Sequence, residues 1–134
     1  MNDESNGGAV LVSERVELFL QDAARPIDFA DAEITGYERR GAALHVSIRL
    51  WNEKRVEVAF GDVLVHECRS ADIEGLRRRT KGGIVEEART AVQLGPDVEL
   101  VEYFFVDAYD HVAARVVCAA NACVTARRVD TERT

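Results

Sequence analysis

The sequence has few cysteines and no apolar run long enough for a membrane span. It holds three cysteines and two prolines in 134 residues, and no apolar run approaches the ~18 residues needed to cross a bilayer. The first residues carry acid where a secretory signal carries base. Cys68, Cys118 and Cys123 form an odd set, and a chain of this length builds a core without cross-links. We therefore expect a cytoplasmic protein with reduced, buried thiols.

The sequence also lacks the common enzyme motifs. It has no glycine-rich phosphate loop, no dinucleotide fingerprint, no nucleophile elbow and no His-Glu-x-x-His metal motif. Its 24 acidic and 17 basic residues give a net charge of -7, which disfavours nucleic acid and anionic lipid and favours a basic or neutral partner. The basic run at 77–81 has no interleaved aromatics, as single-stranded nucleic acid would require. These absences favour a binding or regulatory module without a cofactor, whose partner is neither nucleic acid nor membrane.

The strongest positive signal is alternation. Apolar residues recur at every second position in 44–51 and again in 55–60, as in half-buried antiparallel strands. A three-residue loop at 52–54 keeps the even positions of both strands on one face, and a loop at 40–42 pairs Ile34 with Ile48. The buried face predicted in this way contains Ala32, Ile34, Val46, Ile48, Leu50, Val56, Val58 and Phe60.

The opposite face is then polar. Its predicted rows are Glu33, Arg49 and Glu57, then Thr35, Ser47 and Ala59, then Tyr37 beside His45. Alternating charges in such rows contribute roughly 0.2–1 kcal/mol per pair and secure the register. Trp51 falls on this face opposite Arg55, and aromatic and arginine side chains are enriched in interface hot spots.

Two interpretations of Trp51 remain open. It contacts a partner, or it stacks on Arg55 or lies under an N-terminal helix. The candidate binding residues are Tyr37, His45, Arg49, Trp51 and Glu57.

Helices are expected at three places. Residues 13–24 place Val16, Phe19 and Leu20 on one helical face, although a strand reaching Leu20 is the alternative. Ser70 is positioned to cap a short helix with acids at its start and arginines at its end. Residues 84–92 repeat at helical spacing before Gly95 and Pro96.

The expected fold is therefore α+β. A mainly antiparallel sheet of six or seven strands carries one or two helices on its apolar face. Residues 98–106 form the central strand, because apolar residues occupy both parities, and 112–119 pairs with 122–129 in a final hairpin. The chain is one domain, 1–134, with disordered tails at 1–8 and 130–134.

Two side-chain clusters are weaker candidates for chemistry. Asp107, Asp110 and His111 follow the central strand, where a carboxylate could orient an imidazole, although aspartate in a turn more often bonds its own backbone. Cys118 and Cys123 would face each other across a two-residue turn, whereas a three-residue turn would separate them. A zinc site using these cysteines with His66 and Cys68 lacks the usual paired spacing, and no metal is expected.

Three segments carry a resemblance at the level of strand pattern. Residues 31–34, 50–52 and 56–63 look like small uncharacterised bacterial domains, some of which occur among toxin-immunity proteins. The likeness covers about a quarter of the chain and assigns no site residue. It implies an immunity-like protein that binds another protein through the polar sheet face. The alternative is a small-molecule-binding protein or enzyme that uses the Asp/His cluster in a sheet–helix cleft, and self-association through a sheet edge is a third possibility.

Overall fold

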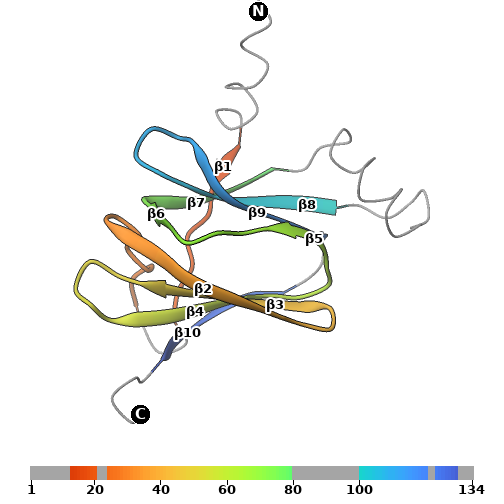
Figure 1. The fold of residues 1–134 in the computed structure, drawn as a ribbon, viewed down its shortest axis with the longest axis horizontal. Helices are drawn as coiled ribbons and strands as arrows, with labels where there is room; N and C mark the ends of the chain where they lie inside the picture. The colour runs from red at the N-terminus through yellow and green to blue at the C-terminus, as the bar shows by residue number, and fades with distance from the viewer. Residues whose placement is uncertain (1–12, 21–23, 80–99, 121–122, 130–134) are drawn as a thin grey trace, which may run out of the picture.

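The fold consists of two antiparallel sheets packed face to face (Figure 1). The computed structural model describes residues 13–20, 24–79, 100–120 and 123–129. One sheet has the strand order β1-β7-β8-β9-β5 and the other β10-β4-β3-β2-β6. The strands are β1 (Glu14–Arg15), β2 (Ala32–Arg40), β3 (Ala43–Arg49), β4 (Arg55–Phe60), β5 (Val63–Glu67), β6 (Ala71–Ile73), β7 (Gly75–Arg79), β8 (Leu100–Val106), β9 (Val112–Ala119) and β10 (Val124–Val129).

The expected α+β class is wrong, because the described residues contain no helix. The segment after Ser70 forms β6 and β7 instead, with Leu76 of β7 opposite Phe105 of β8. Its order of charges suits a helix dipole, yet pairing with an apolar central strand outweighs local preference. The expected 13–24 helix is replaced over residues 13–20 by β1 and an extended segment, with Glu14 opposite Arg78. The 84–92 helix and both tails lie outside the described residues.

The predicted alternation is confirmed over β2, β3 and β4. Every even residue predicted for the inner face is buried except Leu50, which is half-buried and packs against the core. Ile34 lies opposite Ile48, as expected. The β3–β4 connection is five residues long rather than three, because Arg49 pairs with Arg55 and the amide of Leu50 bonds to the carbonyl of Lys54 at 2.8 Å. Because both loop lengths are odd, each side chain lies on the predicted face of the sheet. The residues that pair across β3 and β4 are shifted by two positions from the prediction.

A bulge in β2 corrects a second part of the prediction. The β2–β3 turn has two residues, with Arg40 opposite Ala43, and the register shifts between Ile34 and Gly36. Beyond this bulge the faces of β2 are inverted, as an extra residue in one strand requires. Tyr37 therefore lies opposite Val46, and the predicted row of Tyr37 with His45 does not form.

The predicted final hairpin is also wrong, since β9 and β10 belong to different sheets. β9 pairs with β8 and β5, whereas β10 pairs with β4 and buries Ala126 against the inner face. The prediction of a central strand near 98–106 is confirmed by β8, which is buried along its whole length.

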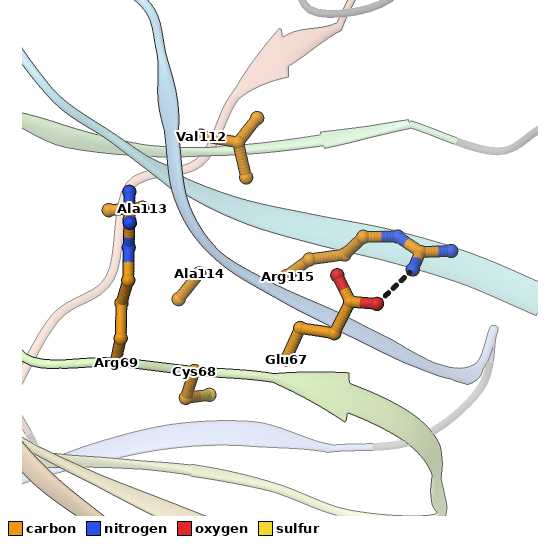
Figure 2. A pocket seen from close by; sticks show the side chains of 7 residues that line it. All are labelled: Glu67, Cys68, Arg69, Val112, Ala113, Ala114 and Arg115. Carbon is orange, nitrogen blue, oxygen red and sulfur yellow. Dashed lines mark ion pairs between the residues drawn. The ribbon is translucent and has the colours of Figure 1, made fainter.

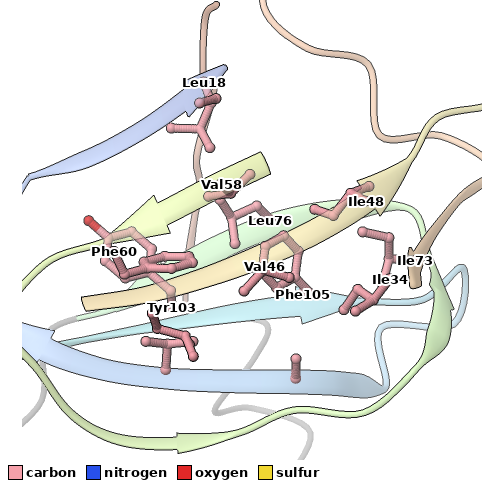
Figure 3. Packing of buried hydrophobic residues seen from close by; sticks show 14 of the residues in the cluster. Leu18, Ile34, Val46, Ile48, Val58, Phe60, Ile73, Leu76, Tyr103 and Phe105 are labelled. Atoms are coloured by element: carbon pink, nitrogen blue, oxygen red, sulfur yellow. The ribbon is translucent and has the colours of Figure 1, made fainter. Parts of the chain in front are cut away.

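Aromatic side chains join the two sheets at the centre of the core (Figure 3). Phe60 of β4 lies 5.3 Å from Tyr103 and 6.2 Å from Phe105 of β8, measured between ring centroids. Phe29, from the segment that precedes β2, completes the cluster at 6.1 Å from Phe105. These contacts join β4, β8 and the segment before β2 in one core. No helix in the described ranges is long and apolar enough to span a bilayer.

Candidate binding surface

The outer face of the β10-β4-β3-β2-β6 sheet holds three of the five predicted binding residues. His45 and Arg49 project from β3 and Glu57 from β4, each half-buried and on the side away from the core. Trp51 lies in the connection just beyond Arg49. We call these four residues, with Glu33 and Arg127, the outer-face site.

The charged groups of the outer-face site neutralise one another. Arg127 of β10 reaches the Oε1 atom of Glu57 with its Nε and one Nη, each at 2.9 Å. His45 Nδ1 is 3.4 Å from the same oxygen, and this buried nitrogen makes no hydrogen bond. Arg49 forms an ion pair with Glu33 across the β2–β3 ladder. The outer-face site therefore presents paired charges to solvent rather than a field of one sign.

Trp51, in the β3–β4 connection at the end of this sheet, has 60% of its surface accessible. Its loop is held by backbone bonds from Glu53 to Leu50 at 2.9 Å and by Asn52, whose carboxamide oxygen accepts the amide of Lys54 at 3.1 Å. Within the described ranges the cation–π contact is that of Arg79 with Phe104, so Trp51 does not stack on Arg55. Residues 13–20 form no helix, so the prediction that Trp51 lies under an N-terminal helix is also wrong.

Tyr37 is the predicted binding residue that the structure separates from the others. The bulge turns it toward the other sheet, where its ring meets His66 of β5 with centroids 5.7 Å apart. Beside it, Arg39 donates to the carbonyl of Val63 at 2.8 Å. Burial, and secondarily the charge of Arg39, lowers the pKa of His66. Tyr37 therefore contacts β5 of the other sheet and is not part of the outer-face site.

The Asp107, Asp110 and His111 cluster forms a tight turn. Asp107 Oδ1 accepts the amides of Tyr109 and His111, both at 2.9 Å, and Asp110 has a left-handed φ of 65°. The His111 amide is the main reason that the pKa of Asp107 is lowered. His111 Nδ1 is 3.6 Å from Asp107 Oδ2, and 76% of the imidazole side chain is exposed. The Asp107 carboxylate thus binds the backbone of its own turn. The predicted cleft between a sheet and a helix does not form in the described residues, because they contain no helix.

The three thiols are free and separated. Cys118 is buried between the sheets, Cys68 is half-buried and Cys123 is exposed, so the expectation of burial fails for Cys123. Burial raises the pKa of Cys118 to about 12 and that of Cys68 to about 11. Cys118 and Cys123 do not face each other, because the hairpin that would align them does not exist. Among the described residues no three His, Cys, Asp or Glu side chains converge as a metal site would require.

Glu102 is the residue that sequence reasoning missed. It lies in the middle of β8 on the face away from the core, with only 1% of its surface accessible. Arg79 of β7 donates to its Oε1 at 3.0 Å, and Arg115 of β9 donates to its Oε2. The only sequence signal is one carboxylate inside an apolar run. Its two partners are 23 and 13 residues away, so only the sheet register reveals the triad.

Arg115 also borders a small hollow of about 370 Å³ (Figure 2). The hollow opens at the end of β5, where the chain leaves β9 and crosses to the other sheet to form β6. Glu67, the last residue of β5, has its carboxylate 3.5 Å from the guanidinium of Arg115. Cys68 and Arg69 line it from the departing chain, and Ala113 and Ala114 line it from β9. Burial, and secondarily the charge of Glu67, raises the pKa of the Cys68 thiol in this hollow, which disfavours the nucleophilic thiolate.

Comparison of the chain with protein-family models, curated proteins and solved structures gives no match.

Proposed function

We propose that this protein is a non-enzymatic module that binds another protein through the outer-face site. The observation that carries the proposal is Trp51, which is 60% exposed in a hydrogen-bonded loop two residues after Arg49, the ion-pair partner of Glu33. A large aromatic ring next to an arginine is the composition of interface hot spots, whose truncation costs about 2 kcal/mol or more.

The paired charges support this role in a second way. Arg127 already holds Glu57, and Glu33 already holds Arg49, in a defined geometry. A partner that meets them loses little side-chain entropy, and ordered charges select partners more than they raise affinity.

The resemblance to immunity-like domains makes a regulatory partner the specific form of the proposal. The free thiols favour a reducing compartment, so we propose that the complex forms in the cytoplasm.

The test starts from photo-crosslinking. A photoreactive amino acid at Lys54, in the Trp51 loop, is expected to capture the partner, whereas the same group at Ala120, just after β9 in the other sheet, is not. Both positions are exposed. The captured protein is then purified and its Kd is measured by calorimetry.

Trp51→Ala is expected to raise that Kd about thirtyfold, which corresponds to about 2 kcal/mol. Tyr109→Ala is the matched control, because Tyr109 is 80% exposed but lies in the β8–β9 turn. A partner that binds the Trp51→Ala and Arg49→Ala variants as tightly as the wild type would refute the proposal.

A further inference from the structure

A groove of about 490 Å³ lies at one end of the sandwich, apart from the outer-face site. It is built where an extended N-terminal segment crosses the start of β7. The amide of Val16 donates to the carbonyl of Leu76 at 2.9 Å, and the amide of Ile27 donates to the carbonyl of Leu18 at 2.7 Å. The β8–β9 turn closes the third side, at the same end of the molecule (Figure 1).

Part of the lining of this groove is apolar, with Val16, Ile27, Phe29 and Val106 from three different segments. Phe29 and Val106 are themselves buried, and Val16 and Ile27 are partly exposed. Such a surface accepts the hydrocarbon part of a ligand side chain.

The groove also has an excess of carboxylates. Five acidic residues line it, Glu17, Asp28, Glu74, Asp107 and Asp110, against two arginines, Arg15 and Arg77. Arg77 is already held by Ser13, through its Nε to Oγ at 2.7 Å and its Nη to the carbonyl oxygen at 2.9 Å. No ion pair within the described ranges involves Glu17, Asp28 or Asp110. Five carboxylates against two guanidinium groups leave the lining with an excess of three negative charges.

From this combination we propose that the groove binds an arginine- or lysine-bearing segment of a protein partner. The long aliphatic stem of such a side chain packs on the apolar lining while its charged head reaches the carboxylates. The carboxylates are spread around the groove, and no three acidic, histidine or cysteine side chains in the described ranges converge on one point. That spacing suits several cationic side chains along a chain better than one compact ion. The net charge of -7 steers a basic partner toward the protein.

The test uses a fluorescein-labelled nonapeptide of alternating arginine and leucine, with anisotropy as the readout. The groove variant is Glu17→Gln with Asp28→Asn. The control is Glu53→Gln with Asp62→Asn, which removes the same charge from exposed residues outside the groove. Asparagine tolerates the left-handed backbone at Asp62, where φ is 46°. Circular dichroism checks that both variants fold.

We expect the groove variant to raise the Kd of the peptide at least fivefold, as the loss of two partly exposed ion pairs implies, and the control to change it less than twofold. Amide shifts on titration should centre on Val16, Ile27 and Val106. If both variants raise the Kd equally, the peptide binds through the overall charge of the protein and the proposal is overturned. Shifts centred on Trp51 and Arg49 would also overturn it. Self-association that the groove variant abolishes, without peptide binding, would assign the groove to a second copy of the chain instead.

Discussion

Removal of the buried carboxylate of Glu102 is the sharpest test of the sheet register. Its two oxygens lie between Arg79 and Arg115, and the side chains of both arginines are only 19% exposed. In Glu102→Ala the two guanidinium groups lose the anion between them and face each other across a buried strand. Truncating one member of a buried ion pair typically costs 3–5 kcal/mol.

The expected loss lies at the lower end of that range, about 3 kcal/mol. Arg115 keeps Glu67 as a partner, and Arg79 keeps its contact with Phe104 at 5.3 Å. For a domain of this size a loss of about 3 kcal/mol lowers Tm by roughly 10 °C. Glu102→Gln, which keeps the shape but not the charge, should fall between the wild type and Glu102→Ala.

The assay is urea unfolding followed by tryptophan fluorescence, with far-UV circular dichroism as a second probe. Glu38→Ala serves as the control, since Glu38 and Arg40 form an exposed pair whose side chains are 61% and 64% accessible. Its midpoint should equal that of the wild type. If Glu102→Ala unfolds at the wild-type midpoint too, Glu102 is not enclosed by the two arginines and the pairing of β7, β8 and β9 is wrong.

Two further predictions concern titratable groups. At pH 8 a thiol reagent should modify Cys123 rapidly and leave Cys118 and Cys68 protected until the protein unfolds, because pKa values of about 12 and about 11 suppress their thiolates; fast modification of Cys118 would contradict its burial. Asp107→Asn should weaken the loss of stability as pH falls below about 4, because the lowered pKa of Asp107 stabilises the fold only while the carboxylate is charged. Unfolding midpoints of both proteins between pH 7 and pH 3 check this, and parallel curves would disprove it.

The sequence by itself determined which residues of β2, β3 and β4 are buried. Side-chain direction in a strand has a period of two, so the alternation from Ala43 to Phe60 assigns faces without knowledge of the partner strands. The same reasoning predicted that β8 is covered on both sides. The alternation does not fix loop length, since the predicted three-residue connection at 52–54 and the observed five-residue connection at 50–54 preserve the same parity.

Only the tertiary structure decided the second sheet, the fate of Tyr37 and the role of Glu102. Residues 71–79 have charges that suit a helix, yet they form strands because Leu76 gains a place opposite Phe105 in the core. A one-residue bulge near Gly36, which leaves no mark in the alternation of β3, turns Tyr37 away from the outer-face site. Glu102 meets its arginines only when three strands lie in register. Local pattern sets the direction of each side chain, whereas contacts between distant segments decide which side chains meet.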